Sequence, residues 1–197
     1  MSTWPNYKTS NMKIKNKFYK EIGLNDWTII IDFDEFLYHK NLRELLESYD
    51  SSGINFPKIC GYNMIGTEVP RDDGITPITK LLYMGVPTDI YGWDIGPNFV
   101  GTYSKRAIFN AKNMSISYEP GCHACHPSGK VVESKNSDIL LLHYKWLSRE
   151  FGIGTYESLT LSQENIRNGY GTIDMGTRLA YYDTSLKRRI VIPGLGG

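Results

Sequence analysis

The chain has 197 residues, of which 41% are hydrophobic and 22% are charged, the composition of an ordinary soluble globular protein. A chain of this length can bury a hydrophobic core without disulfides or a structural metal. Its 22 lysine and arginine residues and 21 aspartate and glutamate residues leave a net charge of +1. The overall charge therefore gives no basis for binding nucleic acid or a membrane surface. We expect a single domain over residues 1–197.

Targeting signals are not evident in the sequence. No apolar run approaches the roughly 20 residues of a membrane span, and the first seven residues lack the charged and then apolar pattern of a signal peptide. Three cysteines, an odd number, argue against a disulfide framework and fit a reducing compartment. We therefore expect a cytoplasmic protein with no transmembrane segment and no nucleic-acid partner.

The first predicted elements are a helix and a strand. Residues 11–21 combine lysines with apolar residues at helical spacing and are followed by Gly23, which predicts an amphipathic helix. Residues 27–31 form a nearly continuous run of tryptophan, threonine and isoleucine. Such a run is typical of a strand that is buried on both faces, in the middle of a parallel or mixed sheet.

A second helix and several further strands come next. Residues 41–49 predict a helix with Asn41 as its N-cap, and Gly53 lies beyond its end. Further strands are expected over residues 54–59, 103–109 and 138–142, and a helix over residues 159–168. Residues 66–100 are rich in proline and glycine, which predicts a loop. A loop of this length is unusual in a compact domain unless it binds a ligand. The pattern predicts an α/β fold with a mixed central sheet flanked by helices.

The acidic segment Asp32-Phe33-Asp34-Glu35 directly follows the first predicted strand. On an extended backbone Asp32 and Asp34 point to the same side, and Phe33 faces the core. Two neighbouring carboxylates repel each other, and a bound cation offsets this cost. An all-oxygen pair suits Mg²⁺ or Mn²⁺. The alternative is that these acidic residues cap the next helix or form a solvated turn.

The second long apolar run, residues 139–142, ends in His143-Tyr144-Lys145-Trp146. If the two runs are neighbouring strands of the same polarity, His143 emerges at the same edge of the sheet as Asp32 and Asp34. An imidazole among carboxylates favours Mn²⁺ somewhat over Mg²⁺, and Lys145 would offset phosphate charge nearby. The sequence thus predicts one metal site made of Asp32, Asp34 and His143.

Two loop regions offer further candidates. Residues 122–126, Cys-His-Ala-Cys-His, have zinc-ligand chemistry, but five consecutive residues do not easily supply four tetrahedral ligands. The alternatives are a loop that presents His123 to a ligand, or a plain surface turn. Aromatic residues in loops suit sugar rings, although they can equally cover the core. Trp93, beside Asp94, is the first of these to test.

Several segments together resemble the family 2-like glycosyltransferases of the GT-A fold. In chain order they are a D-x-D-E-F-L-Y block within residues 26–39, then residues 61–64, 121–123 and 141–145. The resemblance spans about residues 11–170. It implies transfer of a sugar from a nucleotide-sugar donor to a glycan or other hydroxyl acceptor. A divalent metal, Mn²⁺ or Mg²⁺, would stabilise the departing nucleoside diphosphate.

The resemblance also implies roles for single residues. Asp34 corresponds to the metal-coordinating acid, Asp32 to the acid near the donor ribose and the metal, and His143 to the late metal ligand. The residues expected to contact substrate are Asp32, Trp93, His123 and Lys145. An inverting enzyme also needs a carboxylate base. Asp94 and Glu119 are the candidates, because each lies in a loop between the two metal-binding strands.

The amino terminus departs from the family pattern, because only 31 residues precede Asp32. Most of the nucleotide-binding half of a GT-A domain is therefore expected to be missing, as in a fragment or a truncated homologue. The same residues suit two other functions. One is a catalytically inactive GT-A-like domain that binds a glycan or a partner protein. The other is a metal-dependent phosphoester hydrolase that uses Asp32, Asp34 and His143.

Overall fold

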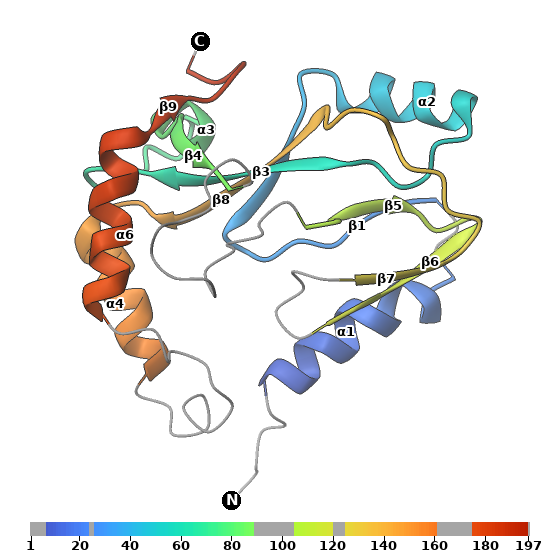
Figure 1. The fold of residues 1–197 in the computed structure, drawn as a ribbon, viewed down its shortest axis with the longest axis horizontal. Coiled ribbons are helices and arrows are strands. Elements are labelled where there is room, and N and C mark those ends of the chain that lie inside the picture. The colour runs from blue at the N-terminus through green and yellow to red at the C-terminus, as the bar shows by residue number, and fades with distance from the viewer. Residues whose placement is uncertain (1–6, 24–25, 89–104, 120–124, 161–174, 197) are drawn as a thin grey trace, which may run out of the picture. The chain divides into compact units, whose positions relative to one another are not determined.

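The computed structural model describes residues 7–23, 26–88, 105–119, 125–160 and 175–196 (Figure 1). It contains helices and a mixed sheet of five strands with parallel and antiparallel pairing, which confirms the expected α/β class. The chain divides into two compact units. The first unit is Met1–Gly61 with Thr102–Leu141, and the second is Tyr62–Gly101 with Leu142–Gly197.

The elements have the order labelled in Figure 1. The first unit holds α1 (Tyr7–Glu21), β1 (Trp27–Ile29), β2 (Glu35–Tyr38), α2 (Leu42–Ser52), β5 (Ile108–Asn110), β6 (Met114–Tyr118) and β7 (Cys125–Gly129). The second holds α3 (Ile78–Leu81), β4 (Met84–Pro87), α4 (Arg149–Thr160), α6 (Met175–Arg188) and β9 (Ile190–Val191). Two strands, β3 (Ile59–Ile65) and β8 (Ile139–Trp146), run from one unit into the other.

The strands form three sheets among the described residues. The five-stranded sheet has the order β2-β8-β3-β4-β9, and β1-β5 and β6-β7 are separate antiparallel pairs. Placing His143 at the same edge as Asp32 and Asp34 required residues 27–31 and 138–142 to be neighbouring strands. Among the described strands this condition is not met, because β1 pairs with β5 whereas β8 lies between β2 and β3. Hydrophobic patterning predicted that these runs are strands but did not determine their partners.

β1 also differs from the expected central strand. It pairs only with β5 among the described strands, with Thr28 opposite Phe109. Thr28 is buried, whereas Ile29 and Ile31 are 48% and 36% exposed. The prediction of a strand buried on both faces is wrong, because only one face of this two-stranded ribbon is covered.

The boundaries of two other predicted strands shift. The strand expected over residues 54–59 begins only at Ile59, after Pro57, which has no N–H to donate to a ladder. The run at residues 138–142 continues to Trp146 in β8, because Tyr144 and Trp146 are residue types that favour strands. His143 and Lys145 therefore lie inside a strand and not beyond its end.

The two helices predicted in the first unit are present. α1 begins earlier than expected, at Tyr7. α2 follows Asn41, whose side chain donates to the Glu44 carboxylate at 2.9 Å and makes no capping bond to the backbone. Gly53 ends this helix in the left-handed conformation with φ of 71°, which glycine adopts without steric cost.

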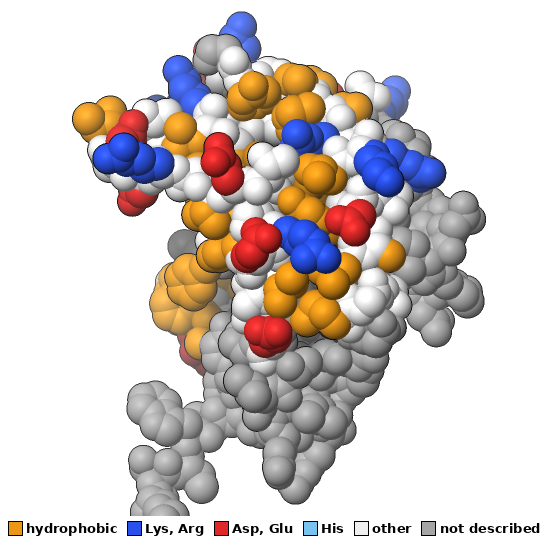
Figure 2. Space-filling model, turned by 90° about the vertical axis from the view of Figure 1, so that its left-hand side faces the viewer, with side chains coloured by type: hydrophobic (Ala, Val, Ile, Leu, Met, Phe, Trp, Pro, Cys, Tyr) orange, Lys and Arg blue, Asp and Glu red, His pale blue; other side chains and the backbone are white. Residues whose placement is uncertain are grey.

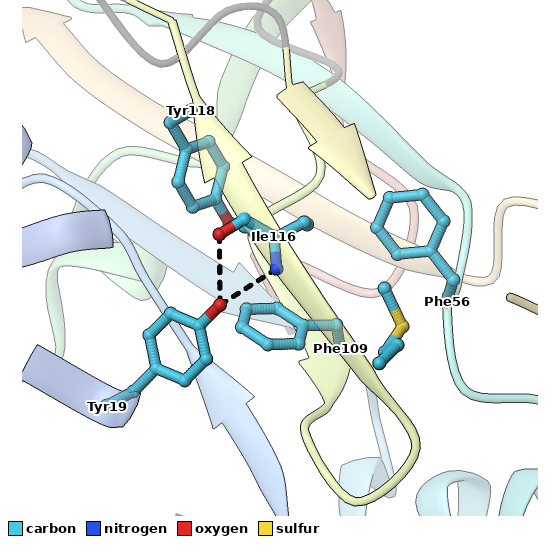
Figure 3. Packing of buried hydrophobic residues seen from close by; sticks show 6 residues of the cluster. Tyr19, Phe56, Phe109, Ile116 and Tyr118 are labelled. Carbon is cyan, nitrogen blue, oxygen red and sulfur yellow. Dashed lines mark hydrogen bonds between the residues drawn. The ribbon is translucent and has the colours of Figure 1, made fainter. Parts of the chain in front are cut away.

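Side chains of α1 complete the edge of β6. The Tyr19 hydroxyl accepts from the Ile116 N–H at 2.8 Å and donates to the Ile116 carbonyl at 2.9 Å (Figure 3). Two residues further along the strand, the Asn16 amide makes the same pair of bonds to the backbone of Tyr118, at 2.7 and 3.1 Å. These four bonds pair backbone groups that would otherwise form an open sheet edge.

The first unit has two groups of buried apolar residues. One surrounds the Tyr19 and Phe109 rings, which meet edge to face with centroids 5.1 Å apart, and includes Phe56, Ile116 and Tyr118 (Figure 3). The other lies beneath α2 and comprises Tyr49, Ile59, Ala107, Ile108, Ile139 and Leu141. Together they fix β5 and the backbone just before it.

The core of the second unit forms around Trp146. Its ring packs on Tyr181 and Tyr182 of α6, with centroids 6.4 and 5.3 Å away. The Tyr182 hydroxyl donates to the Gly66 carbonyl at 2.7 Å. On the side that bears α4 and α6, the coloured hydrophobic side chains are interspersed with charged ones (Figure 2). In the part of the chain that the structure describes, no helix is long and apolar enough to cross a membrane.

Candidate functional site

The acidic segment at residues 32–35 forms a tight turn and not an extended strand. The Glu35 N–H donates to the Asp32 carbonyl at 3.1 Å, and the Asp32 N–H donates to the Glu35 side chain at 2.9 Å. Phe33 is fully exposed at the turn. The predicted extended geometry, with Phe33 in the core, is wrong, because backbone and side-chain bonds between Asp32 and Glu35 reverse the chain there.

Two lysines distant in sequence converge on this turn. Lys15 of α1 approaches one carboxylate oxygen of Asp32 at 2.5 Å, and Lys105 approaches the other at 3.0 Å. Lys105 also pairs with Glu35 at 2.7 Å. The Lys105 and Glu35 side chains are only 2% and 1% exposed, whereas that of Asp32 is 38% exposed. We call these four residues the acid-lysine network.

The network sets the charge state of Asp32. Burial raises the pKa of the Asp32 carboxyl, but hydrogen bonds and charge attraction from Lys15 and Lys105 outweigh it and lower the pKa below the ordinary value of 3.8. Asp32 is therefore an anion at neutral pH. The network thus pairs two lysines with two acidic residues, and Asp34 stands next to it in the sequence.

The acidic turn carries carboxylates, but lysines already engage both oxygens of Asp32. Asp32 and the half-buried Asp34 offer carboxylate oxygens, which Mg²⁺ and Mn²⁺ prefer. Because both oxygens of Asp32 already face ammonium groups, a cation there must displace or share with a lysine. Within the described residues, no group of three or more histidine, cysteine, aspartate or glutamate side chains that could hold a metal is found.

His143, the third predicted metal ligand, belongs to the second unit and is 4% exposed inside β8. Its Nδ1 lies 2.9 Å from the Asn63 side-chain oxygen, and the Asn63 amide donates to the Tyr181 hydroxyl. Because an amide oxygen only accepts, Nδ1 of His143 donates to Asn63, and this bond orients the ring. A hydrogen bond to one ring nitrogen is the usual way in which proteins orient a histidine that binds a metal or acts as a base.

The remaining candidates divide between the two units or lie outside the described residues. Lys145 is half-buried in β8. The Glu119 side chain follows β6, is 51% exposed and pairs with His126 Nε2 at 2.8 Å. Glu119 therefore lacks the burial that is typical of a catalytic base. Trp93, Asp94 and His123 lie outside the described residues.

Sequence reasoning missed four residues of these arrangements: Lys15, Glu35, Lys105 and Asn63. Glu35 stands next to the acidic pair, and Asn63 lies in a block that resembles the glycosyltransferase family, so both were visible as sequence features. Lys15 and Lys105 are 17 and 73 residues from Asp32. Nothing in their local sequence indicates that they meet it.

Comparisons of the chain with protein families, with curated proteins and with solved structures find no match.

Proposed function

We propose that the chain acts in glycosyl transfer, moving a sugar from a nucleotide-sugar donor to a hydroxyl acceptor with the help of a divalent cation. The observation that carries the proposal is the acidic turn, where ionised Asp32 stands next to Asp34 and is held by two lysines. A cation and a diphosphate need this mixture of anionic oxygens and ammonium groups. The resemblance of residues 26–39 to the D-x-D-E-F-L-Y block supports the same function.

The acidic residues of the turn and Lys105 have separate roles in this proposal. Asp32 and Asp34 would hold Mn²⁺ or Mg²⁺, which when bound neutralises the charge that develops on a departing nucleoside diphosphate. Glu35 and Lys105, a buried pair at 2.7 Å, keep the turn in one conformation. Preorganised charge of this kind stabilises a transition state without reorganisation during the reaction.

In the second unit, His143 remains a proposed metal ligand. The Asn63 side chain accepts a hydrogen bond from Nδ1 at 2.9 Å, and a bond of this kind fixes the orientation of the ring. Lys145 remains a proposed phosphate contact. Asp94 and Glu119 remain proposed bases, and substitution of each by asparagine or glutamine tests them separately.

Release of nucleoside diphosphate from a panel of nucleotide sugars, measured by chromatography with Mn²⁺ present, tests this function. We expect one donor to be consumed by the wild type and by Glu47→Ala, which removes an exposed carboxylate of α2. Asp34→Ala should reduce the rate by about a hundredfold or more, as loss of a group that stabilises developing charge does. Equal rates in Asp34→Ala and the wild type would contradict the proposal.

A second candidate is a domain that binds a glycan or a partner protein without turnover. The observation in its favour is that both oxygens of Asp32 are engaged by lysines, which is also what a purely structural ion-pair network needs. Glycan binding that is equally strong in the wild type and Asp34→Ala, without consumption of any nucleotide sugar, would favour this candidate over the enzyme.

A further inference from the structure

The helix α1 has one face toward the protein and another toward solvent. On the first face, Tyr19 and Asn16 bond to the backbone of β6, and the Lys15 side chain is 8% exposed in the acid-lysine network. These contacts hold the helix against β6 (Figure 1). The solvent face is therefore available to a partner without displacement of the helix.

The solvent face carries a row of large apolar side chains. Ile14, Phe18 and Ile22 are 60%, 55% and 51% exposed. A spacing of four residues places them along one side of a helix. The Ile22 N–H donates to the Phe18 carbonyl at 3.0 Å, so the helical turn continues to Ile22. A row of this kind, in contrast to single exposed residues, indicates an interaction surface.

Lysines accompany this apolar row. The helix has five lysines, one glutamate and no arginine in 15 residues, although the whole chain has a net charge of only +1. Lys17 and Lys20 are exposed, and Lys17 lies one helical turn from Ile14. The single acidic residue, Glu21, stands at the end of the helix. Positive charge is therefore concentrated on the helix that carries the apolar row.

This combination favours a lipid surface over another protein as the partner. The cores of protein interfaces are depleted in lysine, whereas helices that lie on membranes combine many lysines with a strip of large apolar side chains. A lysine side chain can reach a lipid phosphate while its methylene groups stay beside apolar neighbours. The negative head groups of anionic lipids complement the charge of α1.

We propose that the solvent face of α1 binds an anionic membrane surface. Ile14, Phe18 and Ile22 enter the boundary between head groups and acyl chains, and Lys17 contacts the acidic head groups. The helix lies in the plane of the surface, because its other face stays bonded to β6. The inference is independent of the proposed function, since it uses no residue of the acidic turn.

Sedimentation of the full chain with lipid vesicles tests this inference. We expect binding to vesicles that contain phosphatidylserine and little binding to phosphatidylcholine alone. High ionic strength should weaken the binding, because salt screens the attraction. Phe18→Ser should lower the partition coefficient about tenfold, the loss expected when an aromatic side chain is no longer buried. Ile75→Ser, at an apolar side chain of the second unit that is 88% exposed, should bind like the wild type.

A second pair of variants tests the charge. Lys17→Gln should lower the partition coefficient about fivefold, as expected for one lysine near an anionic surface. Lys40→Gln removes an exposed lysine outside α1 and should have a much smaller effect. Circular dichroism checks that each variant is folded, and Ile14→Ser replaces Phe18→Ser if Phe18→Ser does not fold.

A folded wild type that does not bind phosphatidylserine vesicles would overturn the inference. Binding that neither Phe18→Ser nor Ile14→Ser weakens would overturn it as well, and so would equal losses in Lys17→Gln and Lys40→Gln, because the contact would then lie elsewhere. A wild type that binds no vesicles but forms a dimer in analytical ultracentrifugation, lost in Phe18→Ser, would assign this face to a second copy of the chain instead.

Discussion

At the scale of single residues, Asp32 is held by partners that come from distant parts of the chain. The acidic segment itself could be predicted to matter from its sequence. The turn geometry of this segment could not be predicted, because the turn depends on hydrogen bonds between Asp32 and Glu35. The ion pairs with lysines could not be predicted either, because Lys15 and Lys105 approach Asp32 only in the folded chain.

The lowered pKa of Asp32 predicts a pH dependence of stability. A carboxyl whose pKa is lower in the folded than in the unfolded state stabilises the fold above the unfolded value, and this contribution is lost as the pH falls through the folded pKa. The advantage of the wild type over Asp32→Asn should therefore be largest at neutral pH and shrink below 3.8. Urea unfolding between pH 7 and pH 3 measures the difference in the free energy of unfolding between the wild type and Asp32→Asn. A difference that does not change with pH would contradict this role of the lysines.

The buried pair of Lys105 and Glu35 should contribute strongly to stability. Lys105→Met leaves Glu35, 1% exposed, without this partner, and breaking a buried ion pair typically costs about 3–5 kcal/mol. Glu47→Gln, on the exposed face of α2, should change the free energy of unfolding by less than about 0.5 kcal/mol. Urea unfolding of both variants tests the difference. Equal small effects would show that the pair is not needed to hold the turn.

At the scale of elements, helices and apolar strands could be predicted from periodicity, whereas side-chain pairing between elements could not. α2 illustrates the first, because its leucines face the core and Gly53 ends it as expected. The contact of α1 with β6 illustrates the second. Asn16 and Tyr19 look like ordinary helical residues in the sequence, yet they complete a strand about a hundred residues later.

Tyr19→Phe tests this helix-to-strand contact. It removes a hydroxyl that both donates to and accepts from the Ile116 backbone, and leaving buried backbone groups unpaired costs about 1–3 kcal/mol. Tyr83→Phe, at a 36% exposed tyrosine, is the control and should have little effect. Thermal or urea unfolding that shows no difference between the two variants would contradict the proposed role of Tyr19.

Two glycines of α4 give a matched pair in the second unit. A methyl group at Gly152 would lie 1.9 Å from the buried Trp146 ring, whereas Gly154 has nothing within 4 Å. Gly152→Ala should destabilise the protein by about 1–3 kcal/mol through overpacking. Gly154→Ala should stabilise it by about 0.5–1 kcal/mol, because alanine favours the helix. Chemical denaturation measures the free energy of unfolding of both variants. Changes of the same sign in the two would contradict this packing of α4.

At the scale of the whole molecule, the α/β class could be predicted from the alternation of apolar runs and amphipathic segments. The strand order β2-β8-β3-β4-β9 could not be predicted, because long-range packing determines which strands become neighbours in a sheet. The metal site predicted from Asp32, Asp34 and His143 stays a prediction. Asp32 and Asp34 belong to the first unit and His143 to the second.

We propose that the acidic turn binds a divalent cation together with a nucleoside diphosphate. Thermal unfolding with Mn²⁺ and UDP, GDP or ADP tests it most directly. A ligand at one hundred times its Kd adds about 2.7 kcal/mol of stability, which corresponds to a rise in Tm of about 5 °C or more. We expect this rise in the wild type and in Glu47→Ala, and none in Asp34→Ala. A folded wild type whose Tm does not respond to any of the three, or an Asp34→Ala variant that responds fully, would contradict the claim.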